Sequence, residues 1–237
     1  MMSTTSKLLK TLAVLSALLP FCTSGFASIV YDNSANNLNK TYAPQPDPNG
    51  VQFGDEINLA AGDRLITNFK FEYFLSGNAS GNETAVLQLL RNDGATITRT
   101  VDGSSFDVQA PGSVLYTSPV LSLQSGFQTA EASGFTPFEA PNNFTWTITF
   151  SGVDPGEVAG LLVYDPPTVG SSFSDFWQNN GGSWNTYLLP NDPITGNPVV
   201  GNFAARVTAV PEPTTLALGL LAGLSFLGYF GYKRRSV

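Results

Sequence analysis

Acidic side chains are the residues of this chain whose type and spacing could support chemistry. Asp55 and Glu56 are adjacent, and Asp154 and Glu157 are three positions apart. Two carboxylates about 5 to 9 Å apart across a cleft can cleave a glycosidic bond. Both pairs lie in turn-like or alternating stretches, which favours solvated turn residues. The chain has no histidine and one cysteine, Cys22, which excludes Ser-His-Asp systems and ordinary catalytic zinc sites. We therefore expect a protein that is not an enzyme.

Loop carboxylates also suggest a metal site. Asp32, Asp165 and Asp175 are the candidate calcium ligands, with Asn33 and Asp93 as further oxygen donors. Calcium takes six to eight oxygen ligands, which loop Asp and Asn residues supply. The sequence contains no EF-hand loop, so calcium at these positions is a hypothesis without a motif behind it. No other cofactor is expected.

An aromatic stretch is the candidate ligand platform. Trp177, Trp184 and Tyr187 lie in a segment rich in Asn and Gly. Aromatic faces attract the C–H groups of sugars, and neighbouring amides can hydrogen-bond hydroxyls; these amides are Gln178, Asn179, Asn180 and Asn185. The alternative is that the rings cover the hydrophobic core, because each ring buries a large area.

The elements that position these residues are expected to be strands. Residues 144–150 alternate strictly between large apolar side chains and threonine, and residues 65–73 repeat the pattern. Residues 158–164 are continuously apolar, as in a strand covered on both faces. Turn-forming pairs of Asn, Asp, Pro and Gly separate these runs. The sequence thus predicts an all-β, antiparallel sandwich of jelly-roll type over residues 28–209.

Charge and composition restrict the functional class. The net charge is −7, and only 12% of residues are charged. An acidic surface repels nucleic acid, so we expect no nucleic-acid partner. A weakly charged chain rich in Gly, Ser, Thr and Asn fits an exported β protein better than a cytosolic helical one.

The N-terminal end has the pattern of an export signal. Residues 1–27 combine two lysines, an apolar run and a small-x-small site. The secretory machinery and signal peptidase are therefore expected partners, with cleavage between Ala27 and Ser28. A lipoprotein signal at Cys22 is the weaker alternative, because the bulky Phe21 precedes the cysteine.

The C-terminal end, residues 210–237, has the pattern of a membrane anchor. Residues 214–232 contain no charged side chain, and about 19 residues of helix reach roughly 28 Å, close to the thickness of a bilayer core. Lys233, Arg234 and Arg235 end this run and place the C-terminus in the cytoplasm. The alternative is a buried helix of a globular domain.

The same end carries a family resemblance. Pro211-Glu212-Pro213, an apolar segment and a terminal basic cluster together resemble the PEP-CTERM sorting signal of bacteria that make extracellular polysaccharide. The resemblance implies recognition by an exosortase, a membrane cysteine transpeptidase that cuts near the motif. The helix would then be a temporary anchor, and the mature protein would reach the cell surface or extracellular matrix.

A second resemblance concerns the segment between the two ends. Residues 29–33 (IVYDN), 54–57 (GDEI) and 64–69 (RLITNF) resemble a choice-anchor domain, most closely the R type. Residues 203–209 similarly resemble a last strand that leads into a sorting motif. This resemblance implies a β-rich module and transfers no catalytic residue.

Three functional hypotheses follow. The first is a non-enzymatic surface or matrix protein that an exosortase sorts and processes. The second is a carbohydrate-binding module in the exopolysaccharide or biofilm matrix. The third is a hydrolase built on one of the carboxylate pairs.

Overall fold

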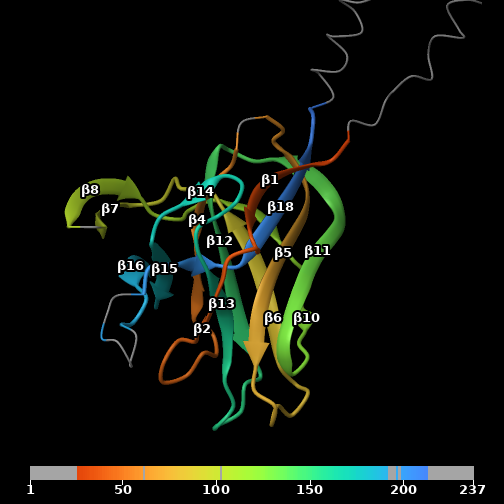
Figure 1. The fold of residues 1–237 in the computed structure, drawn as a ribbon, viewed down its shortest axis with the longest axis vertical. Coiled ribbons are helices and arrows are strands. Elements are labelled where there is room, and N and C mark those ends of the chain that lie inside the picture. Colours follow the sequence, from red (N-terminus) through yellow and green to blue (C-terminus); the bar gives the residue numbers. More distant parts are fainter. Residues whose placement is uncertain (1–25, 61, 102, 192–195, 197–198, 213–237) are drawn as a thin grey trace, which may run out of the picture.

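Strands are the regular elements of the part that the structure, a computed structural model, describes, and no helix occurs there. This part comprises residues 26–212 except 61, 102, 192–195, 197 and 198. They form two large sheets and one hairpin, and all paired strands are antiparallel. The prediction of an all-β antiparallel sandwich is confirmed (Figure 1). The jelly-roll connectivity stays a prediction.

The first sheet has seven strands and contains both ends of the described chain. Its strands, in spatial order, are β1 (Ser28–Asn33), β18 (Ala205–Val210), β5 (Leu65–Leu75), β13 (Ala159–Tyr164) and β17 (Asn202–Phe203), with β11 (Gly126–Glu139) beside β5 and β2 (Asn37–Tyr42) beside β13.

The second sheet has nine strands and carries the aromatic stretch at one edge. Its main order is β10 (Leu121–Ser122), β6 (Thr84–Leu90), β12 (Asn143–Ser151), β3 (Gln52–Gly54), β15 (Asp175–Asn180) and β16 (Ser183–Leu188), with β9 (Val114–Thr117), β4 (Glu56–Asn58) and β14 (Ser171–Ser172) attached. A separate hairpin joins β7 (Thr96–Val101) and β8 (Ser104–Gln109).

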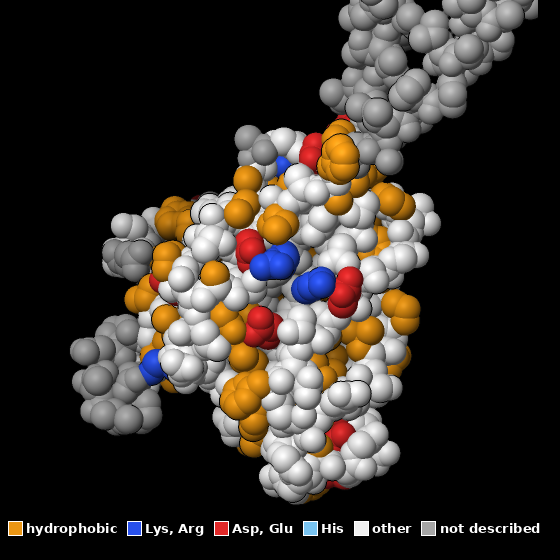
Figure 2. Space-filling model, turned by 45° about the vertical axis from the view of Figure 1, so that its right-hand side comes forward, with side chains coloured by type: hydrophobic (Ala, Val, Ile, Leu, Met, Phe, Trp, Pro, Cys, Tyr) orange, Lys and Arg blue, Asp and Glu red, His pale blue; other side chains and the backbone are white. Residues whose placement is uncertain are grey.

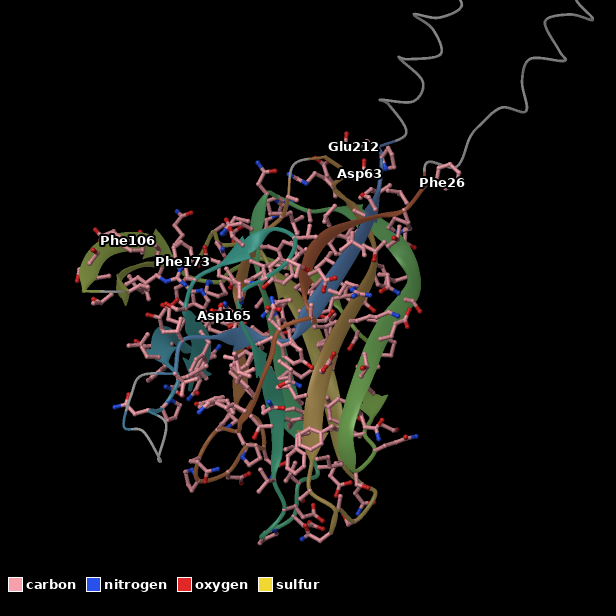
Figure 3. All side chains as sticks on the ribbon, viewed as in Figure 1. Phe26, Asp63, Phe106, Asp165, Phe173 and Glu212 are labelled. Carbon is pink, nitrogen blue, oxygen red and sulfur yellow. The ribbon has the colours of Figure 1, made fainter. Side chains whose placement is uncertain are left out.

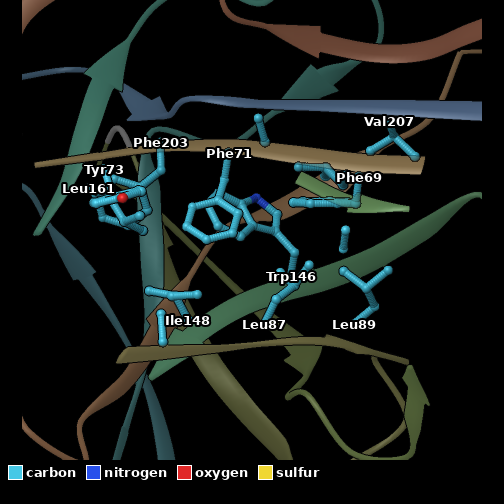
Figure 4. Packing of buried hydrophobic residues seen from close by; sticks show 14 of the residues in the cluster. Phe69, Phe71, Tyr73, Leu87, Leu89, Trp146, Ile148, Leu161, Phe203 and Val207 are labelled. Atoms are coloured by element: carbon cyan, nitrogen blue, oxygen red, sulfur yellow. The ribbon is translucent and has the colours of Figure 1, made fainter. Parts of the chain in front are cut away.

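The core lies between the two large sheets and is rich in aromatic rings. Trp146 of β12 is fully buried and packs against Phe69 and Phe71 of β5, with ring centroids 5.3 and 6.1 Å away (Figure 4). Phe203 meets Trp146 edge-on at 6.4 Å. Tilted and edge-on pairs at such distances add to the stabilisation that burial provides. The alternating apolar residues therefore form one continuous core.

Two strands depart from the simple alternation. The sequence pattern places Leu65 on the face of Phe69, whereas the structure buries Ile66 and leaves Leu65 half-buried. β5 has one extra residue, Thr67, opposite β18. This β-bulge shifts the alternation by one position, so Ile66 and not Leu65 faces the core. On β12, the threonines of the supposedly polar face are buried at positions 145 and 147. By contrast, every residue of β13 is buried, as its continuous apolar run predicts.

The first and last described strands lie side by side. Ser28 pairs with Ala209 and Asn33 with Ala205, so β1 and β18 run antiparallel along their whole length. The start of β1 and the end of β18 therefore lie at the same pole of the sandwich (Figure 1). Asp63 and Glu212 lie at this pole near Phe26 (Figure 3).

Candidate functional site

The three predicted platform aromatics lie on one hairpin but do not form one surface. On β15 and β16, Trp177 pairs with Thr186, Asn179 with Trp184, and Phe176 with Tyr187. Directly opposed residues share a face, and so do residues two apart. Trp177 and Trp184 therefore share one face, whereas Tyr187 lies on the other, its ring centroid 5.9 Å from that of Phe176. A carbohydrate platform at these residues stays a prediction, and Tyr187 would not share a face with the two tryptophans.

Trp177 is also inaccessible. It is fully buried, and its Nε1 donates a hydrogen bond to Glu56 Oε2 at 3.2 Å. Tyr187, by contrast, is 39% exposed and accepts a hydrogen bond from Asn180 Nδ2 at 2.6 Å. Trp177 thus matches the alternative interpretation, in which the ring belongs to the packed interior.

Trp177 adjoins a buried ionic cluster, because Arg99 Cζ lies 5.7 Å from the centroid of its ring. The β7–β8 hairpin carries Arg99, whose side chain has no exposed area. Its guanidinium donates to Asp175 through Nε at 2.8 Å and through Nη2, and to Glu56 Oε2 through Nη1 at 2.5 Å. Its Cζ lies 3.9 Å from the centroid of the Phe173 ring. Sequence reasoning missed Arg99, because its carboxylate partners are 43 and 76 residues away and no local pattern indicates them.

The cluster keeps its arginine charged. Burial alone would lower the pKa of Arg99, but hydrogen bonds and Coulombic attraction from Asp175 and Glu56 raise it above its ordinary value. Glu56 is further held by Asn143 Nδ2, which donates to Oε1 at 2.7 Å. Both carboxylates are therefore committed to internal partners. The arrangement joins the hairpin to the second sheet and offers no free group for chemistry.

The candidate calcium ligands lie in different settings. Asp175 pairs with Arg99, whereas Asp32 pairs with Arg206 at 3.0 Å. Asp165 accepts a hydrogen bond from Asn202 Nδ2 at 3.1 Å. Across the described ranges, no group of three or more His, Cys, Asp or Glu side chains is arranged to hold a metal. Calcium at these residues stays a prediction, and two of the three carboxylates already have a cationic partner.

The members of the two candidate carboxylate pairs have different surroundings. Asp55 points into the core, where its Oδ2 accepts the backbone N–H of Phe203, while Glu56 points to the opposite face. Burial raises the pKa of Asp55 well above its ordinary value, although the Phe203 hydrogen bond opposes this shift. Asp154 and Glu157 close a local turn, in which the Asp154 N–H donates to Glu157 Oε2 at 2.9 Å.

The sorting motif begins directly after a central strand. β18 pairs with β1 on one side and β5 on the other, and its last residue, Val210, pairs with Leu65. Pro211 and Glu212 follow at once and are half-buried. The described residues contain no helix with the length and apolarity needed to span a membrane.

Several predicted features lie outside the described residues. These are Pro213, the apolar run 214–232, Lys233, Arg234 and Arg235, and residues 1–25 of the export signal. The predicted signal cleavage between Ala27 and Ser28 falls immediately before β1 and stays a prediction.

Comparison with known proteins gives one match. Residues 209–235 match the PEP-CTERM protein-sorting motif. No curated protein and no solved structure matches the chain. The match overlaps the last two residues of β18 and extends past the end of the sandwich. Such a motif implies an exported protein with a C-terminal sorting signal that an exosortase processes. The resemblance to a choice-anchor domain has no support from these findings.

Proposed function

We propose that this protein is a non-enzymatic component of the cell surface or extracellular matrix, exported as a membrane-anchored precursor and processed by an exosortase at Pro211–Pro213. The observation that carries the proposal is the sorting motif at residues 209–235, which overlaps the last two residues of β18 and continues past the sandwich. The motif is the recognition site, residues 214–232 are the temporary anchor, and the sandwich is the cargo.

The position of the motif supports processing without damage to the cargo. β18 hydrogen-bonds to strands on both sides, and its buried residues Ala205, Val207 and Ala209 belong to the core. A cut within β18 would remove a central strand and expose two sheet edges. A cut beyond Val210 leaves both ladders complete, so we expect the mature protein to keep all of β18.

The shared pole supports the proposed topology. Signal cleavage before Ser28 and exosortase processing beyond Val210 would occur at the same end of the sandwich, because Ser28 and Ala209 are partners. Before processing, the cargo would lie outside the inner membrane and the C-terminus in the cytoplasm. Signal peptidase, the secretory machinery, the exosortase and the membrane are then its partners during export.

The absence of catalytic function is part of the same proposal. Asp55, between β3 and β4, and Glu56, the first residue of β4, point in opposite directions. Asp154 and Glu157 hold a turn together. Neither arrangement leaves two carboxylates free on opposite sides of a substrate, as glycoside hydrolysis requires.

The test is the mass of the exported product. The full-length chain, with an epitope tag after Val237, is produced in a bacterium with its exosortase gene intact or deleted. We expect the released protein to end beyond Val210 without the tag, and the deletion strain to retain the tagged form in membranes.

Substitution of both motif prolines, Pro211→Ala with Pro213→Ala, should also retain the tagged form. Pro155→Ala, in an exposed turn, is the matched control and should be processed normally. Loss of the tag at equal rates in the deletion strain or the double variant would refute processing at this motif.

A further inference from the structure

The outer face of the seven-stranded sheet is hollowed. The alternation that buries Phe69, Phe71 and Tyr73 of β5 places Lys70 and Glu72 on the opposite face. A hollow of about 350 Å³ there is lined by Ser34, Lys70, Glu72, Thr129, Ala204 and Arg206. A second hollow of about 430 Å³ is lined by Asn37, Lys40, Thr41, Glu72, Phe127 and Tyr164. Glu72 lines both, so the two hollows are adjacent, and together we call them the outer groove. Their volumes lie in the range of ligand sites.

Four charged side chains cross this face in one row. Asp32, Arg206, Lys70 and Glu131 occupy directly paired positions on β1, β18, β5 and β11. Arg206 Nη2 lies 3.0 Å from Asp32 Oδ2, and Lys70 Nζ lies 3.1 Å from Glu131 Oε2. Figure 2 shows basic side chains beside acidic ones across one face of the molecule. The row has no net charge, because each cation has its own carboxylate.

This pattern indicates what kind of ligand the outer groove fits. Lys40 and Glu72, which also line the hollows, add one charge of each sign. With three cations and three carboxylates, the outer groove has no net charge that would concentrate an anion or a cation. It does place N–H donors next to carboxylate acceptors. A sugar hydroxyl both donates and accepts hydrogen bonds, so neighbouring hydroxyls of a neutral sugar can use both kinds of group at once.

Glu72 is held in place for such a role. Tyr164 OH donates to Glu72 Oε2 at 2.6 Å and accepts from Asn37 Nδ2 at 3.0 Å. Burial, together with the neighbouring Glu72, raises the pKa of Tyr164 to about 12, so the phenol stays protonated at neutral pH. The glutamate is therefore oriented before any ligand arrives, which reduces the entropy lost on binding.

An exposed ring completes the outer groove. Phe127 is 67% exposed, and its centroid lies 4.9 Å from that of Phe74 on the neighbouring strand. It lines the second hollow together with Glu72. A supported aromatic face beside hydrogen-bonding groups is suited to stack against the C–H face of a pyranose ring.

We propose that the outer groove binds a segment of neutral polysaccharide, with a sugar ring on Phe127 and its hydroxyls on Glu72, Lys70 and Arg206. This site lies on the other sheet from the aromatic hairpin of Trp177 and Trp184. The inference rests on the proposed export, because extracellular polysaccharide is met outside the cell. Its test uses purified protein, so a failure here would leave exosortase processing standing.

The test is affinity electrophoresis of the full-length protein in mild detergent, through gels containing dextran, galactomannan, hydroxyethylcellulose or the acidic polymer alginate. We expect at least one neutral polymer to retard the protein. Phe127→Ala and Glu72→Gln should each weaken that binding about tenfold. Val120→Ala, at a site that is 65% exposed and elsewhere on the surface, is the matched control and should bind as the parent does.

Each other outcome overturns the proposal. Retardation by none of the polymers, or by alginate alone, would exclude a neutral-glycan site. Binding that survives Phe127→Ala but is lost in Trp184→Ala would move the site to the aromatic hairpin. Equal thermal unfolding of parent and variants shows that a loss of binding does not reflect misfolding.

Discussion

The buried arginine of the β7–β8 hairpin gives the sharpest prediction. Arg99→Met keeps a long apolar stem but removes the guanidinium that bonds to Asp175 and Glu56. Two carboxylates would then remain buried side by side, with Trp177 Nε1 and Asn143 Nδ2 as donors to Glu56 alone. The variant should be much less stable than the parent.

The expected cost can be worked from these contacts. Removing one partner from a buried ion pair costs about 3–5 kcal/mol, because an uncompensated charge stays behind. The variant also loses the cation–π contact between the guanidinium and the Phe173 ring, whose centroid lies 3.9 Å from Arg99 Cζ. This loss adds about 0.5–2 kcal/mol. The free energy of unfolding of such domains is about 5–15 kcal/mol. Arg99→Met should therefore remove a large part of the total stability.

Urea unfolding of the full-length protein in mild detergent, followed by tryptophan fluorescence, measures this cost. The matched control is Arg91→Met, at an exposed position, which should change the unfolding free energy by less than about 0.5 kcal/mol. The triple variant Arg99→Met, Glu56→Gln, Asp175→Asn should recover much of the loss, because it leaves no unpaired charge in the cluster.

Two results would refute the reasoning. If Arg99→Met is no less stable than Arg91→Met, the guanidinium does not hold the hairpin. If the triple variant is as unstable as Arg99→Met alone, the cost is lost packing and not an unpaired charge.

Two further predictions concern the interior. Burial raises the pKa of Asp55 in the folded state. The protonated carboxyl therefore contributes fully to the unfolding free energy below the pKa that Asp55 has in the unfolded chain. This contribution is lost as pH rises through the pKa of the folded state. Asp55→Asn should make the unfolding free energy, measured in urea, fall less as pH rises. If its dependence on pH is the same in the variant and the parent, the prediction is wrong. Gly54→Ala would place a Cβ 2.0 Å from the Trp146 carbonyl oxygen and should cost about 1–3 kcal/mol. Gly77→Ala, with nothing within 4 Å, is its control; equal thermal unfolding of the two variants would rule out the clash.

Strand periodicity identified much of the fold from the sequence. The alternation of residues 144–150 and the apolar run of 158–164 are local patterns. Both gave core strands, although the second strand begins at Ala159 and leaves Val158 exposed. The burial of Thr145 and Thr147 could not be predicted this way. Their hydroxyls hydrogen-bond to Asn92 and Gln52, which are distant in sequence.

The candidate sites show the same division. The PEP motif is a linear signal, so the sequence alone was sufficient to find it. The arrangement of Trp177, Trp184 and Tyr187 depends on hairpin register, which composition does not reveal. The outer groove depends on the pairing of four strands, and its charged row joins Asp32 to Arg206, 174 residues away.

The place of β18 between β1 and β5 bears on how the chain matures during secretion. A polypeptide that crosses the membrane N-terminus first delivers residues 205–210 after every other strand. Until they arrive, β1 and β5 present facing edges with unpaired amides and carbonyls, which invite aggregation. A polypeptide cut short before Ala205 would leave both edges unpaired. The cargo is therefore protected from edge-to-edge aggregation only once residues 205–210 have crossed the membrane and paired with β1 and β5.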